Sequence, residues 1–388
     1  MRAAAGVLFL AIPAVLALVA VVALALVWRV YLSVPRLASV APAVEGAGPR
    51  VSIMVAARNE AVHIRAAVAS LLNQDYHDFE LIVVEDRSSD ATGDILDAMA
   101  AKTNRLAVEH VRTLPAGWLG KNYALHLGAK RATGDVLLFI DGDVILERSA
   151  VARAIRVMDE SAADHVVVSP QMELPSWPLR LVVGYFLTWG VIFTRLWRVS
   201  DPRSSASIGV GAFNMVRAAS YRAAGGHERI AMRPDDDLML GKILKASGAR
   251  PRVLFGQGMV SVEWYASVRE ATLGFRKNAY AALGYNPALF AGSVLGNLVQ
   301  GIVPFAAVWL VDGPERVLYG VTVAALMAAY AKTCVEQRLP VWLTLFYPLA
   351  ALLQTVMLAI AVSRTIAAGG IEWRGTFYPL DQLKANRI

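Results

Sequence analysis

Two aspartates, Asp141 and Asp143, follow the apolar run LLFI in the stretch LLFIDGDVIL (137–146) and are separated only by Gly142. Two like charges this close repel each other, and a bound divalent cation removes that cost. Carboxylate oxygens suit Mg²⁺ and Mn²⁺, which also bind substrate phosphates. A D-x-D pair is also a common turn sequence, so the prediction of a metal site here depends on its position after an uncharged strand.

A second acidic cluster consists of Asp235, Asp236 and Asp237, and apolar residues at helical spacing follow it. Carboxylates at a helix N-terminus complement the helix dipole, so one of the three can serve as a cap. A cap needs only one carboxylate, however, and three adjacent ones repel one another. We therefore expect one of the three to act as a general base.

The segments that must position these clusters alternate between apolar runs and helix-like stretches. Continuous apolar runs are typical of strands buried on both faces. Strand–helix alternation predicts a parallel α/β sheet with right-handed crossovers. The predicted strands cover 51–57, 79–86, 106–111 and 135–140, and the predicted helices cover about 60–72, a stretch opened by Asp90 and Thr92, 121–131 and 147–158.

Polar residues follow three of the four predicted strands. In open α/β sheets, ligands bind outside the carboxyl ends of the strands. Three strands that deliver polar groups to one edge therefore predict a binding site there. These residues are Arg58, Asn59 and Glu60 after the first strand, Glu85, Asp86 and Arg87 at the second, and Asp141, Gly142 and Asp143 at the fourth.

The composition indicates a membrane protein, with 56% hydrophobic and 18% charged residues. Residues 7–28 carry no charge and are long enough to cross a bilayer. A signal peptide is the competing interpretation, but its apolar core is normally about 7–15 residues long. Further candidate spans lie at about 288–311, 316–333 and 340–363. The uncharged run within 176–200 is short for a span, so we expect an interfacial helix, with a buried core helix as the alternative.

These features divide the chain into five parts. They are an N-terminal transmembrane helix (1–32), a linker (33–49), an α/β domain (50–285) with the interfacial helix near 176–200, C-terminal transmembrane helices (286–365) and a tail (366–388).

The net charge of +7 and the pI near 9.5 come from scattered basic residues. Anionic lipid headgroups are therefore a better match than nucleic acid. Arg29, Arg36 and Arg50 follow the first span and only Arg2 precedes it, which predicts that the α/β domain faces the cytoplasm. Four spans would place the basic tail outside, against its charge. Either a re-entrant late segment or an overridden charge bias would resolve this conflict.

The single cysteine, Cys334, excludes an intrachain disulfide and a cysteine-based metal site.

Four stretches occur in an order and spacing that resemble family 2 glycosyltransferases, over roughly residues 50–285. They are VSIMVAARNEAVHI, ELIVVEDRSSDATGDI, GKNYALHLGAKRATGDVLLFIDGDV and DDDLMLGKILKASG. A later stretch, SVREATLGFRKNAYAALGY (267–285), resembles the membrane-proximal segment of bacterial members that glycosylate lipids, such as carotenoid glycosyltransferases. The resemblance implies an α/β GT-A domain (nucleotide-diphospho-sugar transferase, Rossmann-like) plus transmembrane helices.

The resemblance also implies a nucleotide-diphosphate sugar as donor, Mg²⁺ or Mn²⁺ as cofactor, and inversion at the anomeric carbon. It places one group of residues at the nucleotide and its diphosphate, namely Arg58, Asn59, Glu60, Asp86, Lys121 and Asp141. It makes Asp141 and Asp143 the metal ligands, with Asp143 the more direct one. The family's acidic pair falls on Asp236 and Asp237, which favours Asp237 as the base, while a shifted alignment would nominate Asp235.

The sequence thus predicts an inverting glycosyltransferase (a hexosyltransferase) of the inner (plasma) membrane that transfers a sugar to a lipid acceptor at the cytoplasmic leaflet. One alternative is a polysaccharide synthase, although the Q-x-x-R-W motif of processive members is absent. Another is a non-catalytic, nucleotide-sensing membrane protein. We expect no nucleic-acid partner.

Overall fold

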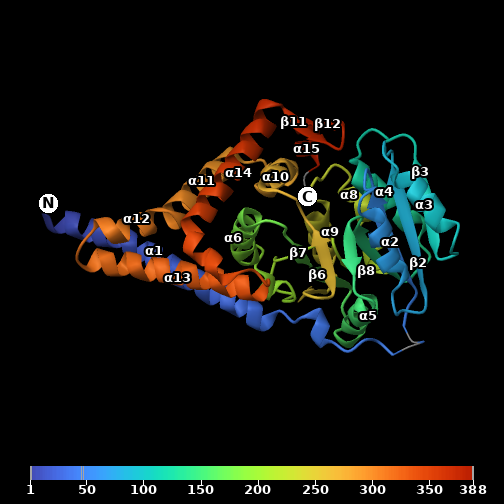
Figure 1. The fold of residues 1–388 in the computed structure, drawn as a ribbon, viewed down its shortest axis with the longest axis horizontal. Helices are drawn as coiled ribbons and strands as arrows, with labels where there is room; N and C mark the ends of the chain where they lie inside the picture. The colour runs from blue at the N-terminus through green and yellow to red at the C-terminus, as the bar shows by residue number, and fades with distance from the viewer. Residues whose placement is uncertain (1, 45, 47, 387–388) are drawn as a thin grey trace. The chain divides into compact units, whose positions relative to one another are not determined.

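The structure is a computed structural model and describes residues 2–44, 46 and 48–386 (Figure 1). The chain forms two compact units, each assembled from separated segments. The helical unit comprises Met1–Ser33, Leu174–Trp197 and Tyr265–Ile371. The sheet unit comprises Val34–Glu173, Arg198–Trp264 and Glu372–Ile388.

A seven-stranded sheet of order β3-β2-β1-β4-β8-β6-β9 forms the centre of the sheet unit. Its first four strands are parallel and match the predicted strands to within one residue. They are β1 (Val51–Ala57), β2 (Phe79–Asp86), β3 (Leu106–Val111) and β4 (Val136–Asp141). The register places Ala57 beside Glu85 and Ala56 beside Asp141, so the polar residues that follow these strands share one edge, as predicted.

The other half of the sheet departs from the predicted parallel arrangement. Strand β8 (Asn214–Arg217) runs antiparallel to both β4 and β6 (His165–Ser169), and β6 pairs in parallel with β9 (Pro251–Phe255). A separate three-stranded sheet contains β5 (Val144–Leu146), β10 (Val260–Glu263) and β7 (Gln171–Glu173). The sheet is therefore mixed.

Helices cover both faces of the large sheet, because alternate side chains along each strand point to opposite faces. Ile53 and Val55 of β1 pack with α2 (Ile64–Leu72), α3 (Thr92–Ala100) and α5 (Ala150–Glu160). Met54 packs with α4 (Gly120–Arg131), α7 (Ala218–Ala223) and α9 (Asp236–Ala246) on the other face. The short α8 (Gly226–Arg229) and η2 (Leu196–Arg198) complete the elements before β9. The result is a three-layer α/β/α arrangement (Figure 1).

Three local predictions differ from the structure. Helix α2 begins at Ile64 instead of residue 60, because Asn59 has a left-handed φ of 54° that a helix cannot continue. Helix α5 begins at Ala150, because the residues before it form β5. The predicted linker 33–49 contains η1 (Leu37–Ser39), whose Leu37 is fully buried in the core of the sheet unit.

Within the residues that the structure describes, five helical segments are long and apolar enough to cross a membrane. They are Leu10–Ser33, Trp177–Arg198, Pro287–Leu310, Pro314–Glu336 and Val341–Ala367. Their elements are α1 (Arg2–Ser33), α6 (Trp177–Phe193), α11 (Pro287–Gly301), α12 (Val303–Leu310), α13 (Pro314–Glu336), η3 (Val341–Phe346) and α14 (Tyr347–Ala367). Helix α10 (Val268–Ala282) precedes α11.

The helices of the helical unit pack around a core of small and aromatic side chains. Tyr330 of α13 donates a hydrogen bond to the Leu181 carbonyl of α6 at 2.8 Å, and Cys334 is buried nearby, as a small apolar residue would be. Large apolar side chains such as Leu18 (64% exposed) and Trp309 (79% exposed) point outward. Helix α6, predicted to be interfacial, is grouped with the other apolar helices.

After α14 the chain returns to the sheet unit. The boundary between the two units falls within β11 (Gly370–Trp373). Strand β12 (Thr376–Pro379) and helix α15 (Leu380–Ala385) follow. The segment predicted as a tail is therefore folded, and its residues from Glu372 onward belong to the sheet unit.

Candidate active site

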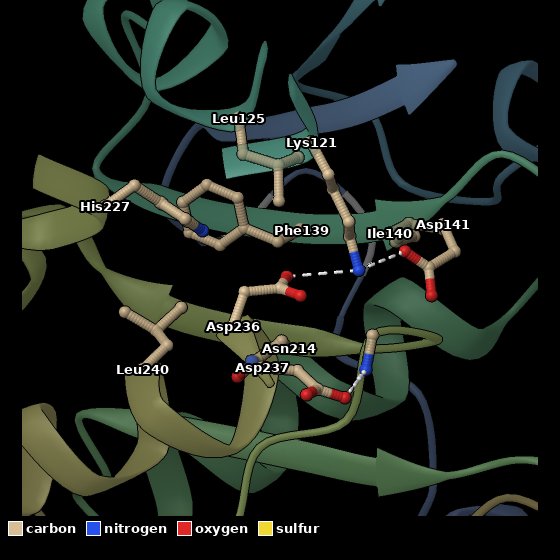
Figure 2. Close-up of a pocket in the computed structure, with 11 residues that line it drawn as sticks. Lys121, Leu125, Phe139, Ile140, Asp141, Asn214, His227, Asp236, Asp237 and Leu240 are labelled. Atoms are coloured by element: carbon tan, nitrogen blue, oxygen red, sulfur yellow. Dashed lines mark hydrogen bonds and ion pairs between the residues drawn. The ribbon is translucent and has the colours of Figure 1, made fainter. Parts of the chain in front are cut away.

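Lys121, the second residue of α4, lies between the two acidic clusters (Figure 2). Its Nζ atom is 2.7 Å from Oδ1 of Asp141 and 3.1 Å from Oδ2 of Asp236. Burial disfavours the charged ammonium, but the carboxylates of Asp141 and Asp236 outweigh that effect and raise the pKa of Lys121. The structure thus brings together a lysine, a strand end and a helix N-terminus that are far apart in the sequence.

A loop glycine connects the strand end to the acidic cluster. The backbone N–H of Asp141 donates to the Gly211 carbonyl at 2.9 Å, and the Gly211 N–H donates to Oδ2 of Asp237 at 3.0 Å. A side chain at Gly211 would overlap the Asp141 carboxylate. Only glycine allows this close approach. The sequence did not nominate this residue, and the GVG triplet at 209–211 was its one local signal.

The three adjacent aspartates have different environments. Asp235 forms a two-point ion pair with Arg233, with its carboxylate oxygens 2.7 and 2.8 Å from Nη2 and Nε. Asp236 pairs with Lys121, and Asp237 accepts hydrogen bonds from Gly211 and from the Leu238 N–H (2.8 Å). Burial, assisted by the charge of Asp236, raises the pKa of Asp237 to about 6. The pairing with Arg233 counts against Asp235 as the base.

Asp143 lies beside two other carboxylates and has no basic side chain at ion-pairing distance among the described residues. Burial raises its pKa to about 7, and the charges of Asp141 and Glu60 act in the same direction. The same part of the chain holds no ready-made group of three metal-ligating side chains. Asp141 and Asp143 nevertheless fit Mg²⁺ or Mn²⁺, because these ions bind few protein ligands and complete their shells with water and phosphate oxygens.

The predicted nucleotide-binding residues at the ends of β1 and β2 contact one another. Asp86 is held by Arg87 (2.7 Å) and lies 3.6 Å from Nη1 of Arg58, whose Nε is buried and has no hydrogen-bond partner in the described part of the chain. The Asn59 side chain accepts a hydrogen bond from the Ser89 N–H at 2.8 Å and so braces the loop after β2.

One cavity is lined by only part of the predicted site. Figure 2 shows Lys121, Asp141, Asp236 and Asp237 around it, with apolar side chains such as Phe139 forming its floor. The predicted residues Arg58, Asn59, Glu60, Asp86 and Asp143 are not among its lining residues. His227, which also lines the cavity, is bonded through Nδ1 to the Tyr221 hydroxyl at 2.8 Å.

The tail supplies contacts at this edge that the sequence did not predict. Arg374 pairs with Glu60 at 2.6 Å, and the Tyr378 hydroxyl accepts a hydrogen bond from the Gly120 N–H at 3.4 Å. The sequence signal was Gly375 in a two-residue gap between two short β-prone stretches, IEW and TFY, because glycine favours a hairpin turn there.

Comparisons with known proteins agree with this arrangement. Residues 52–220 match the family described as Glycosyl transferase family 2. A 4,4'-diaponeurosporenoate glycosyltransferase of Staphylococcus haemolyticus is 28% identical over 225 residues, which cover 55% of this chain and 56% of that protein. A GalNAc(5)-diNAcBac-PP-undecaprenol beta-1,3-glucosyltransferase of Campylobacter jejuni is 28% identical over 115 residues, which cover 30% of this chain and 36% of that protein. The chain therefore spans about half or less of the length of these curated relatives.

Among solved structures, the mannosyltransferase PcManGT of Pyrobaculum calidifontis, in complex with GDP-Man and Mn²⁺, matches with a TM-score of 0.56 and 20% sequence identity. The match covers 90% of this chain and 99% of that one, and it confirms the predicted GT-A fold. The sequence match and the fold agree: residues 52–220 match glycosyltransferase family 2, and the chain has the GT-A fold.

Proposed function

We propose that this protein transfers a sugar from a nucleotide-diphosphate sugar to a membrane lipid, with inversion at the anomeric carbon. The observation that carries the proposal is the convergence of Asp141, Asp236 and Asp237 around Lys121 at the carboxyl edge of the sheet. The match of residues 52–220 to family 2 supports the donor class, and the apolar helices support the lipid acceptor.

Asp141 and Asp143 would hold a divalent cation. When bound, Mg²⁺ or Mn²⁺ would stabilise the negative charge that grows on the diphosphate as the sugar leaves. Lys121 would contribute a second positive charge to the same oxygens, because its ammonium already lies 2.7 Å from Asp141. The PcManGT structure, which contains Mn²⁺ and GDP-Man, supports this cation class.

Asp237 would accept the proton of the attacking hydroxyl group. Both of its oxygens accept backbone hydrogen bonds, which fix the orientation of the carboxylate. Its pKa of about 6 leaves it mostly ionised at neutral pH and makes it a stronger base than an ordinary aspartate. One base on one side and one leaving diphosphate on the other suffice for a single displacement, which inverts the anomeric carbon.

Two relatives support the lipid acceptor by their names, a diaponeurosporenoate glycosyltransferase and an enzyme that acts on a PP-undecaprenol glycan. The absence of Q-x-x-R-W also favours transfer of a single sugar over processive synthesis. The charge bias around α1 favours the cytoplasmic leaflet of the inner membrane as the location of the reaction.

The path of the chain limits which helices cross the membrane. Helix α6 connects two segments of the sheet unit, and β4 on one side of it pairs with β8 on the other. A single crossing by α6 would separate these paired strands, so α6 does not cross. The chain leaves the sheet unit after Trp264 and returns at Glu372, which requires an even number of crossings. At least one of the three apolar segments between them is therefore re-entrant or interfacial.

The function is tested with the full chain in lipid nanodiscs, nucleotide sugars, Mn²⁺ and a panel of membrane lipids. We expect release of nucleoside diphosphate together with a glycosylated lipid of inverted anomeric configuration. Asp143→Asn and Asp237→Asn should each abolish transfer, while Asp94→Asn, an exposed aspartate of α3, should not. Full activity in both active-site variants would reject the roles of these residues. A product that lengthens with time would indicate a polysaccharide synthase, and nucleotide binding without turnover would indicate a sensor.

A further inference from the structure

The segment after α14 is fastened to the carboxyl edge of the sheet at three points. We call residues 372–386 the C-terminal strap. Arg374 contacts the end of β1, and Tyr378 contacts the N-terminus of α4. The Asn386 side chain accepts a hydrogen bond from the Met232 N–H and donates one to the Arg229 carbonyl, both at 3.2 Å, just before the acidic cluster. The strap therefore contacts the same elements that carry the candidate active site.

Arg374 occupies an unfavourable backbone conformation. It has a φ of 50°, and Gly375 next to it has a φ of 74°, so the two form the centre of a tight hairpin turn of the I′ type. Asn, Asp or Gly is preferred at the first of these positions, and the left-handed conformation is unfavourable for an arginine. A long cationic side chain at a strained turn position points to a functional constraint on that side chain.

The guanidinium of Arg374 is aimed at the active-site edge. Its Nη2 lies 2.6 Å from Oε1 of Glu60, and its Nη1 donates to the Arg58 carbonyl at 2.9 Å. Glu60 in turn lies close enough to Asp141 and Asp143 for their charges to influence one another. Glu60 thus connects Arg374 to the proposed metal ligands. The Arg374 side chain remains 38% exposed.

A second guanidinium, that of Arg58, lies near the same turn. A Cβ at Gly375 would be 3.8 Å from Nη2 of Arg58, so the turn packs over that side chain. Arg58 keeps a buried Nε without a hydrogen-bond partner among the described residues. The turn thus carries one guanidinium and packs near a second, and an anion bound between the two would be favourable to both.

We infer that Arg374 is a donor-binding residue whose guanidinium binds the diphosphate of the nucleotide sugar, and that the C-terminal strap forms one wall of the donor site. The inference rests on the proposed function in placing the donor at this edge. A guanidinium suits a diphosphate because its planar fork of N–H groups matches two phosphate oxygens. Arg374 uses two nitrogens for the contacts described, and its partly exposed group can exchange Glu60 for a phosphate.

The test measures binding to the full chain in nanodiscs with Mn²⁺, by calorimetry. The probes are UDP and GDP, each compared with its nucleoside monophosphate. Arg374→Ala should weaken diphosphate binding at least tenfold and monophosphate binding much less, so that the preference for the diphosphate collapses. Arg374→Lys should recover part of that preference, because it keeps the positive charge. Lys384→Ala removes a positive charge from the same strap and should leave the preference unchanged.

A purely structural role for Arg374 gives a different pattern. Arg374→Ala would then weaken diphosphate and monophosphate binding equally and lower the unfolding temperature, and Arg374→Lys would behave like Arg374→Ala. That pattern, or unchanged diphosphate binding, would overturn the inference while leaving the proposed function intact. If the unmodified chain binds neither diphosphate, the donor placement itself fails, and the inference fails with it.

Discussion

The ammonium of Lys121 lies 2.7 Å from the carboxylate of Asp141, where its positive charge compensates the negative charge of the carboxylates at this edge of the sheet. The same ammonium contacts the buried carboxylate of Asp236. Without a bound metal, this lysine is the positive charge that makes the acidic groups compatible with burial.

Replacing Lys121 with Met should destabilise the protein and make it respond more strongly to Mn²⁺. Removing the ammonium takes away the positive charge beside the buried Asp236 carboxylate. We expect the free energy of unfolding to fall by about 2–4 kcal/mol, less than for a fully buried pair because Asp141 is 38% exposed. A divalent cation can take over the lost charge. Thermal unfolding should therefore show a larger Mn²⁺-induced rise in the variant than in the unmodified chain. No Mn²⁺-induced rise in either protein would contradict a cation site at Asp141 and Asp143.

The aspartates of the acidic cluster should separate into a catalytic and a structural group. Asp237→Asn should lower kcat by about 10²–10⁴, the usual contribution of a general base, with little change in unfolding temperature. Asp235→Asn should instead lower stability by about 3 kcal/mol, because it leaves Arg233 buried without its carboxylate. Transfer rates and thermal unfolding of both variants check this. The reverse pattern would identify Asp235 as the base.

Gly211→Ala should impair catalysis more than folding. The added methyl group would overlap the Asp141 carboxylate, so Asp141 or the Gly211 backbone must move. We expect at least a tenfold loss in kcat, because small misplacements at a reacting centre have large effects on rate. Gly190→Ala in α6 is the matched control, since a methyl group there meets no atom within 4 Å. Equal activity of the two variants would show that Gly211 does not position Asp141.

Acid should destabilise the sheet unit through His165. This imidazole is fully buried, burial lowers its pKa to about 4, and its Nδ1 has no partner among the described residues. Between pH 6.5 and 4 the unfolded chain binds a proton here and the folded chain does not, so stability is retained above pH 6.5 and falls as the pH decreases.

For this residue, the free energy of unfolding should fall by up to about 1.4 kcal/mol for each pH unit of acidification in this range. Unfolding temperatures at pH 7.5, 6.5 and 5.5 measure it, and His165→Gln should show a smaller acid effect than the unmodified chain. His77→Gln, at an exposed position, serves as the control. If His165→Gln keeps the full acid sensitivity, another group is responsible.

The tail and the sheet unit should lie on the same side of the membrane. In a Cys334→Ala background, single cysteines replace Ala101 in the sheet unit or Gln382 in the strap, both of which are exposed. A membrane-impermeant maleimide should label both or neither in sealed vesicles of one orientation, and a permeant maleimide should label both. Opposite labelling of the two positions would contradict the contacts of the strap and restore an odd number of crossings.

The sequence alone predicted the elements whose signals are local. Strands β1 to β4 were found to within one residue, because each is a continuous apolar run that ends in polar residues. Their parallel order also fixed the edge at which Asp141 lies. The family motifs lie on these same elements, which is why the family and the GT-A fold could be predicted and were confirmed.

The tertiary structure decided what depends on distant parts of the chain. Nothing near the acidic cluster in sequence shows that Lys121 binds Asp236, or that Gly211 binds Asp237. The return of Arg374 to Glu60 joins residues 314 positions apart. Side-chain periodicity encodes burial within one helix or strand, whereas such contacts depend on how the whole chain packs, and packing sets the charge environment of each active-site residue.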